Sequence, residues 1–360
     1  MYTVWWVAND FSERKILTKW TRLVYWERLN DRQPLEMLAF AHNAMEGVSL
    51  PDYARIQIHN GDRLVWSGRL CAESWGLTER GYKDVEFQGT DATQYAERAL
   101  VIPQQSYATV EDGTYVWPLV GDRLIQTGCV DDQMRSLVRS QLVSPLHAQR
   151  AHADMRCEDD LSLGTSLRTD VGTDSLLKAL QDLADLDSLR FRFVPEVDGA
   201  TFMVRRQWGQ DRTDSYIVEQ TRHNIRSLTV RRFYGGVENA IYGIADGGGI
   251  FAPQVIPAFN EPSIAQYGIG EALLRRTGTP GNIYTATEIK AGQARGTNDL
   301  ELSQLSETYG SKWFLGDTFT IRATRGERLF TWEVLVTGVR VAVDAKGQVE
   351  VEPELEVQYA

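Results

Sequence analysis

The sequence predicts a β-rich α+β fold in which two related β-barrel-like domains flank a small α+β domain. The first observation is a similarity between two distant segments, Gly-Asp-Arg-Leu-Val-Trp at 61–66 and Gly-Glu-Arg-Leu-Phe-Thr-Trp at 326–332. The tryptophan of each segment is followed fifteen positions later by a glycine that we expect in a turn, Gly81 or Gly347. Internal similarity indicates repeated structural units. Each unit is predicted to be a short strand, a tight turn, a long strand, a second turn and a short strand; the alternative is a chance likeness of two amphipathic hairpins.

The second observation is a change of pattern in the middle of the chain, where apolar residues take up helical spacing. It divides the 360 residues into an N-terminal barrel-like domain at 1–100, an α+β domain at 101–220 and a second barrel-like domain with inserted helices at 221–360. This length is enough for two or three domains with cores of their own.

Residues 1–100 are predicted to be mostly β. Asn60-Gly61 lies between alternating apolar residues, which is typical of a two-residue hairpin turn. We expect a long strand over 64–75, another at 85–87, and then a short helix capped by Thr90 or Asp91.

Residues 101–220 are predicted to contain two helices and a hairpin. The helices extend over 131–142 and from 173 or 174 to 183, where leucines recur on one face. The hairpin covers 189–206 with its turn at Asp198-Gly199, and the polar stretch 143–172 is predicted to be loop.

Residues 221–360 return to strands. We expect strands at 225–233 and 240–244, a flexible break at Gly247–Gly249, helices at 263–276 and about 297–309, and a final sheet of 318–323, 330–343 and 348–356.

Composition excludes several classes of protein. The net charge of −11 argues against a chain that binds nucleic acid through counterion release. No apolar run approaches the ~18 residues of a membrane helix, and the first residues, MYTVWWVANDF, lack the basic start of a signal peptide. Cys71, Cys129 and Cys157 lack metal-like spacing, so we expect buried thiols and synthesis in a reducing cytoplasm.

No motif for catalysis or metal binding stands out, so the sequence predicts no catalytic residue, no cofactor site and no metal site. Neighbouring acidic residues are expected in turns and helix starts rather than across a cleft, and the histidines are scattered. The acidic groups are Glu111/Asp112, Asp131/Asp132 and Glu158-Asp159-Asp160, and the histidines are His42, His59, His147, His152 and His223. There is no Gly-x-Ser-x-Gly elbow, and the glycines at 247–249 lack the setting of a phosphate loop.

Tryptophan is the most unusual part of the composition, with ten in the chain and four of them, Trp5, Trp6, Trp20 and Trp26, near its start. Aromatic side chains on strands pack in cores and interfaces or stack on sugars. Packing is the expectation here, and carbohydrate stacking is the alternative.

Taken together, these segments resemble the tail-hub (baseplate hub) proteins of long-tailed bacteriophages, over nearly the whole chain. The matching segments are Leu23-Val24-Tyr25-Trp26-Glu27-Arg28, Leu50-Pro51, Trp66-Ser67-Gly68, VRRQWGQDRT at 204–213, Asn239-Ala240-Ile241-Tyr242, Tyr267-Gly268 and Leu315-Gly316-Asp317. In that family two barrel-like domains flank an α/β middle, and three copies close a ring of six similar barrels.

The resemblance implies a non-enzymatic structural protein of the phage tail tip, made in the host cytoplasm. A homotrimer would adapt the sixfold tail tube to threefold tip components. Its partners would be the distal tail or tail-tube protein, the tape-measure protein, and tip or fibre proteins. Tape-measure protein and DNA would leave through its channel, with no specific binding of DNA and no membrane insertion by this chain. The alternating acids Glu350, Glu352, Glu354 and Glu356 are a candidate solvated or lumenal stripe.

Two alternatives stay open. One is a β-rich tail protein that binds or cleaves host-surface glycans, which a patch of exposed tryptophans beside paired carboxylates would favour. The other is the spike-base protein of a contractile injection machine, which would work in nearly the same way as a tail hub.

Overall fold

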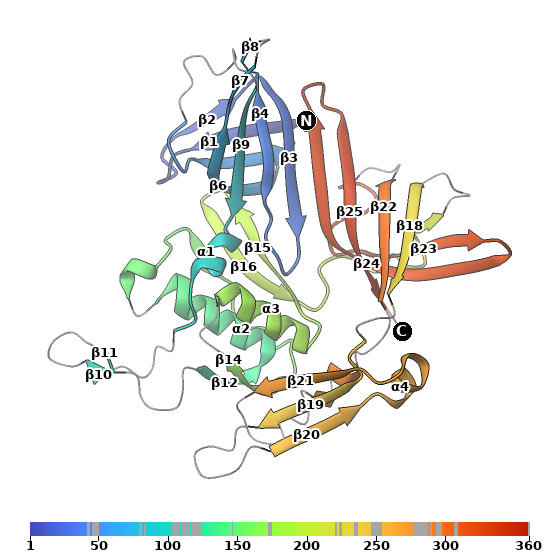
Figure 1. Cartoon of the computed structure of the whole chain (residues 1–360). Helices are drawn as coiled ribbons and strands as arrows, with labels where there is room; N and C mark the ends of the chain where they lie inside the picture. The colour runs from blue at the N-terminus through green and yellow to red at the C-terminus, as the bar shows by residue number, and fades with distance from the viewer. Residues whose placement is uncertain are drawn as a thin grey trace.

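Strands from both ends of the chain meet in one large sheet in the computed structural model (Figure 1). The structure describes residues 1–41, 44, 50–78, 81–82, 84–102, 108–109, 115–116, 124–145, 147–171, 175–219, 222, 225–233, 237–245, 254–276, 287–288, 290–292, 297–305 and 309–358. The sheet has the order β17-β23-β24-β3-β4-β9-β6-β5-β1-β2, and β25 also pairs with β24. Its strands are β1 (Tyr2–Val7), β2 (Arg14–Leu17), β3 (Trp20–Arg28), β4 (Leu35–Phe40), β5 (Arg55–Asn60), β6 (Arg63–Ser74), β9 (Val85–Asp91), β17 (Ile217–Glu219), β23 (Thr318–Arg325), β24 (Arg328–Asp344) and β25 (Val349–Gln358).

Both predicted hairpins are present, and each has a glycine at the start of a two-residue turn. Gly61 has φ +60° between β5 and β6, and Gly326 has φ +63° between β23 and β24. A positive φ favours glycine because a Cβ atom would be strained there. In each unit the long second strand also pairs with a third strand, β9 or β25.

The two similar tryptophans are buried on the second strand of their hairpins. Trp66 lies opposite Ile58 and Trp332 lies opposite Ile321. Trp66 follows its turn glycine by five positions and Trp332 by six, and their partners Ile58 and Ile321 precede those glycines by three and five positions, so the two tryptophans differ in register. Their origin by duplication stays a prediction.

β24 joins the two halves of the sheet. Its first part pairs with β23 through Leu335, and its second part pairs with β3 from Gly338 onward. One hydrophobic core accordingly contains residues from both ends of the chain, including Tyr25, Trp66, Trp313 and Val341. The two predicted barrel-like regions therefore share one sheet and one core.

The middle of the chain forms a separate core of helices and short strands below the large sheet (Figure 1). Its helices are α1 (Thr93–Arg98), α2 (Val130–Val138), which continues as a π-helical turn (Arg139–Val143), the 3₁₀ turn Ala148–Arg150, and α3 (Leu176–Leu186). Its strands are β12 (Leu124–Cys129), β13 (Met155–Cys157), β14 (Ser166–Val171), β15 (Arg190–Glu196) and β16 (Gly199–Arg205). β12 pairs with β14, and β16 lies between β13 and β15. The fold is thus β-rich α+β, as predicted.

The remaining described strands form smaller sheets. They are β7 (Leu77–Thr78), β8 (Gly81–Tyr82), β10 (Ala108–Thr109), β11 (Tyr115–Val116), β18 (Ile225–Phe233), β19 (Ala240–Ala245), β20 (Gln254–Phe259), β21 (Glu271–Arg276) and β22 (Thr297–Leu305), with helix α4 (Glu261–Tyr267) after β20. β18 and β22, which are distant in the chain, form an antiparallel pair, and β22 lies beside β25 (Figure 1).

Three predictions of secondary structure are wrong. The helix expected over 263–276 ends at Tyr267, because Gly268 takes φ +79° and the chain then continues as β21. The helix expected near 297–309 is strand β22, in which Leu300 and Leu302 alternate into the core. The loop expected over 143–172 contains β13 and β14.

Helix starts were predicted to within a few residues. The N-cap position of α1 is Ala92, which makes no side-chain capping hydrogen bond, rather than Thr90 or Asp91. α3 is capped by Ser175, whose hydroxyl accepts a hydrogen bond from the Lys178 amide at 3.3 Å. The predicted break at 247–249 lies outside the described residues.

Candidate assembly surfaces

The predicted acidic stripe lies on one exposed face of β25, and arginines neutralise most of it. Glu352 pairs with Arg340 at 3.2 Å, and Glu354 pairs with Arg28 at 3.0 Å. Glu356 accepts two hydrogen bonds from Arg190 of the α+β unit, at 2.7 and 2.8 Å. The alternation along β25 is as predicted, but these three carboxylates pair with arginines of β24, β3 and β15 instead of presenting free negative charge.

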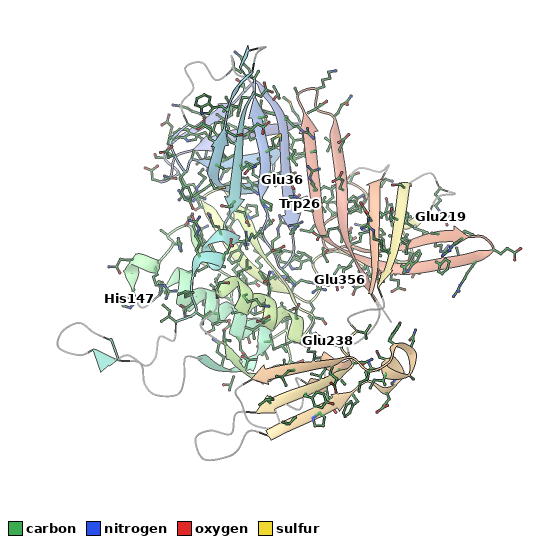
Figure 2. All side chains as sticks on the ribbon, in the orientation of Figure 1. Trp26, Glu36, His147, Glu219, Glu238 and Glu356 are labelled. Carbon is green, nitrogen blue, oxygen red and sulfur yellow. The ribbon has the colours of Figure 1, made fainter. Side chains whose placement is uncertain are left out.

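Trp26 belongs to the same surface, where β3 meets β24 (Figure 2). The guanidinium of Arg28 lies over the Trp26 ring at 3.8 Å, and the indole N–H donates to Glu36. Arg340 also donates to Glu36, at 2.8 Å. Partial burial opposes ionisation of Glu36, but the hydrogen bonds from Trp26 and Arg340 outweigh it and lower the pKa of this carboxyl. One face of this indole is thus covered by a guanidinium.

The other three N-terminal tryptophans are half-buried and have contacts of their own. Trp5 meets His59 edge-on, Trp6 packs on the large core with Lys15 over its ring, and Trp20 packs on the same core. These contacts agree with the expected packing role. Trp75, just after β6, is the exposed exception, at 69%.

The acidic groups of the middle domain are fixed by basic groups and backbone amides. Arg135 is buried and contacts Asp131, Asp132 and Glu158 at 2.5, 3.1 and 2.9 Å. The amides of residues 161–164 donate to the two aspartates, which ties this loop to the start of α2. Burial opposes ionisation of Asp131, yet the amides of Leu163 and Gly164 and the Arg135 guanidinium lower its pKa.

Cys129, Asp131 and Asp132 offer ligand atoms that all lie within 4.8 Å of one another. Their carboxylate oxygens already accept these N–H groups, so the arrangement is explained by the Arg135 network. Asp160 pairs with Arg139 at 2.8 Å, and Glu111 and Asp112 lie outside the described residues.

The histidines and cysteines do not come together in the described part of the chain. His152 stacks on Tyr95 at 4.0 Å, His147 begins the 3₁₀ turn (Figure 2), and His42 and His223 lie outside the described residues. The expected burial of all cysteines is wrong: Cys71 is exposed, and Cys129 and Cys157 are half-buried. Burial raises the pKa of the Cys157 thiol to about 11, so it is protonated at neutral pH.

The small sheet β20-β19-β21 presents an apolar face that sequence reasoning missed. Val255, Phe259 and Leu273 are 59%, 45% and 51% exposed. The register places all three on one face, with Tyr242 opposite Leu273. The other face carries the small core of Ile241, Ala258 and Ala291. Strand β20 carries apolar residues on both of its faces, and this is the feature of the sequence that could have predicted the exposed apolar face.

Known structures share this fold along the full length of the chain. The tail protein from Neisseria meningitidis MC58 is 13% identical, with a TM-score of 0.57, over 99% of this chain and 96% of that protein. A prophage tail protein from Listeria monocytogenes EGD-e is 10% identical, with a TM-score of 0.58, over 99% and 94%. The 43 kDa tail protein of prophage MuSo2 from Shewanella oneidensis is 10% identical, with a TM-score of 0.58, over 99% and 96%.

The sequence matches no protein-family model and no curated relative. Among the described helices, none is long and apolar enough to cross a membrane. The structural matches confirm, at the level of the fold, the resemblance that the sequence carries: this chain has the fold of phage tail proteins.

Proposed function

We propose that this chain is a non-enzymatic structural protein of a phage tail, placed in the hub at the tail tip. The observation that carries the proposal is the match of the whole fold to three tail proteins. The match covers 99% of this chain and at least 94% of each of those proteins. The acidic clusters at Asp131 and Glu158 support a structural role, because their carboxylates hold arginines and backbone amides.

The finer proposal is a homotrimer that adapts the sixfold tube to threefold tip components. Its neighbours would be the distal tail or tail-tube protein and tip or fibre proteins, and its channel would pass the tape-measure protein and DNA. The domain limits 1–100, 101–220 and 221–360 are part of this proposal. The two three-stranded units β5-β6-β9 and β23-β24-β25 support a pair of similar building blocks in each copy.

We assign the apolar face of β20-β19-β21 to contact with a neighbouring copy. Large contiguous apolar patches on a protein surface mark interaction sites. Val255, Phe259 and Leu273 are exposed on one face of a three-stranded sheet. A self-association surface of this kind must be apolar at its centre to form a stable interface.

The first test is the mass and symmetry of the purified chain, by light scattering and negative-stain averaging at raised concentration. A ring of three copies with a central hole supports the hub. Leu273→Asp is expected to shift the mass toward the monomer, because a buried unpaired charge opposes association. Val197→Asp is the matched control, since Val197 is an exposed apolar residue on the β15–β16 turn, far from this face in the sequence.

A trimer that Leu273→Asp leaves intact would remove this face from the interface while leaving the hub in place. A chain that stays monomeric at all concentrations, also when mixed with tail-tube protein, would contradict the hub. Glycan binding and hydrolysis assays would then follow.

A further inference from the structure

A pocket of about 500 Å³ opens where the large sheet meets the α+β unit. It lies between β6, α1 and the segment that follows the π-helical turn of α2. Its polar lining consists mainly of three arginines and three aromatic rings: Arg69, Arg98, Arg150, Tyr53, Tyr95 and His152. No aspartate or glutamate lines it among the described residues. Three cations around one pocket are unexpected in a chain with a net charge of −11.

Neutral oxygens hold these guanidinium groups in place. Arg69 donates to the Tyr95 hydroxyl at 3.2 Å and to the Asn9 side-chain carbonyl at 2.6 Å. Arg98 donates to the Tyr53 hydroxyl at 3.3 Å, and Arg150 donates to the Leu100 carbonyl at 2.6 Å. A guanidinium has five N–H donors, so these bonds leave donors on Arg69 and Arg98 for a further acceptor.

Arginines elsewhere in the interior contact a carboxylate. Arg135 contacts Asp131, Arg192 contacts Glu27, and Arg55 contacts Asp154. In the described part of the chain, Arg69 and Arg98 have no carboxylate within ion-pair distance, which sets the pocket apart.

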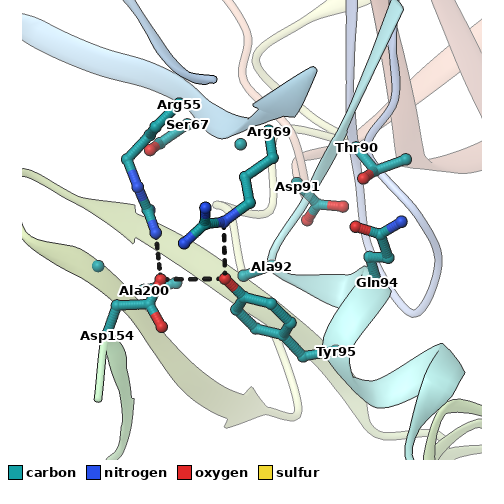
Figure 3. Close-up of a pocket in the computed structure, with 12 residues that line it drawn as sticks. Arg55, Ser67, Arg69, Thr90, Asp91, Ala92, Gln94, Tyr95, Asp154 and Ala200 are labelled. Atoms are coloured by element: carbon teal, nitrogen blue, oxygen red, sulfur yellow. Dashed lines mark hydrogen bonds and ion pairs between the residues drawn. The ribbon is translucent and has the colours of Figure 1, made fainter. Parts of the chain in front are cut away.

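Asp154, a carboxylate that contacts the lining residue Tyr95, is already paired with Arg55. Figure 3 shows Asp154 contacting both Arg55 and the Tyr95 hydroxyl, while Arg69 donates to the same hydroxyl. Burial opposes ionisation of Asp154, but the ion pair with Arg55 lowers its pKa and keeps it charged. The Asp154 charge therefore balances Arg55 and leaves the pocket cationic.

His152 is also affected by the positive charge around the pocket. Its ring stacks on Tyr95, and its pKa is lowered first by burial and also by Arg69 and Arg150, although Asp154 acts in the opposite direction. A neutral His152 adds an aromatic wall to the pocket without neutralising the arginines.

We propose that this pocket binds an oxyanion, a carboxylate or phosphate group, through Arg69, Arg98 and Arg150. Planar guanidinium groups match the paired oxygens of either group and form charge-assisted hydrogen bonds with them. The aromatic rings of Tyr53 and of the Tyr95–His152 stack form the walls. The anion has two possible sources, a free small phosphate or the acidic side chains of another protein. The inference does not depend on the proposed tail function.

The test is isothermal titration of the full chain with two probes, inorganic phosphate and a capped triglutamate peptide, each against sodium chloride at equal ionic strength. We expect a Kd of about 1 mM or tighter for at least one probe. Arg98→Gln should weaken that binding about tenfold or more, and it should fold because Arg98 is exposed. Arg98→Lys keeps the charge but not the paired N–H donors of a guanidinium. Its affinity for the anion should lie between those of the natural protein and Arg98→Gln.

Arg328→Gln is the matched control, because it removes the same charge from an exposed position on the β23–β24 hairpin. Phosphate binding with weaker peptide binding identifies a free anion as the source, and tighter peptide binding identifies a protein carboxylate. Failure of both probes to bind overturns the proposal. Equal loss of binding in Arg98→Gln and Arg328→Gln also overturns it, because the effect would then come from net charge.

Discussion

At the scale of single residues, a chain of buried polar side chains joins the large sheet to the α+β unit. Gln33 donates to Asp91 at 3.1 Å and accepts from Arg192 at 2.8 Å. Arg192 also donates to Glu27 at 3.1 Å, and Glu27 accepts from the Tyr309 hydroxyl at 3.0 Å. A buried network of this kind is stabilising only while each member keeps its partners.

Replacement of Arg192 by methionine should therefore be costly. It removes the buried cation from the fully buried Glu27 and leaves only the half-exposed Arg63, 3.5 Å away. Breaking a buried ion pair in this way costs about 3–5 kcal/mol. Arg156→Met is the control, because Arg156 forms exposed ion pairs with Glu196 and Asp198 and should cost about 1 kcal/mol or less. Urea unfolding measures both, and similar losses for the two variants would contradict the importance of the buried chain.

Asp91 should give the protein a distinct pH dependence. Burial raises its pKa to about 6, although hydrogen bonds from Thr93 and Gln33 oppose the shift. Because the folded-state pKa lies above the unfolded value, the contribution of Asp91 to stability is greatest below pH ~4 and is lost as the pH rises through ~6.

Asp91→Asn removes this titration. The free energy of unfolding of the natural protein should fall relative to that of Asp91→Asn between pH 4 and pH 7, by about 1.4 kcal/mol for each unit of pKa shift. Parallel curves for the two proteins, from denaturant unfolding at several pH values, would show that the carboxyl titrates normally.

At the scale of elements, β24 decides how the two halves of the sheet are joined. It changes partner from β23 to β3 at the bulge between Val336 and Gly338. A Cβ atom at Gly338 would lie 2.4 Å from a Glu354 carboxylate oxygen and 3.1 Å from Cγ of Arg28. The absence of a side chain there lets β24 pass close to the Arg28–Glu354 ion pair.

Gly338→Val should thus displace that ion pair and destabilise the protein by about 1–3 kcal/mol, the usual cost of overpacking. Gly338→Ala should cost less, because the Glu354 side chain can rotate away. Gly292→Ala is the control, since a Cβ atom there would meet nothing within 4 Å. Thermal unfolding of the three variants tests this, and a Gly338→Val protein as stable as the control would refute the close-approach argument.

Local pattern predicted some elements and failed for others, for reasons that particular residues show. Asn60-Gly61 and the alternation around it are local signals, and the predicted hairpin is present, with its turn one residue later at Gly61-Asp62. Residues 263–276 have helical spacing, but Gly268 interrupts them and Glu271–Arg276 pairs with β19 instead. Strand β22 is decided by its partner β18 and by burial of Leu300 and Leu302 against the large core.

At the scale of the whole molecule, stability is distributed unevenly. β3 and β24 contribute to a core that draws residues from both ends of the chain, whereas the β20-β19-β21 sheet rests on a cluster of Ile241, Ala258 and Ala291. Regions with few buried apolar contacts open at lower free energy than the core.

Amides of β19 in the isolated chain should consequently exchange with solvent faster than those of β3 and the second half of β24, as measured by hydrogen exchange with mass spectrometry. Assembly should slow the exchange of β19 selectively if its sheet carries the contact between copies. Equal protection of β19 and β24 in the isolated chain would contradict this order of stability.

The sequence by itself determined the β-rich α+β class, both glycine-turn hairpins, the helices at 130 and 176, and a resemblance that the fold later matched, because these depend on local periodicity and turn chemistry. The tertiary structure alone decided the pairing of β3 with β24, the neutralisation of the β25 glutamates by Arg28, Arg190 and Arg340, and the arginine pocket. Each of these joins residues that are distant in the chain. Their contacts depend on strand register and packing, which the order of residues in one segment does not specify.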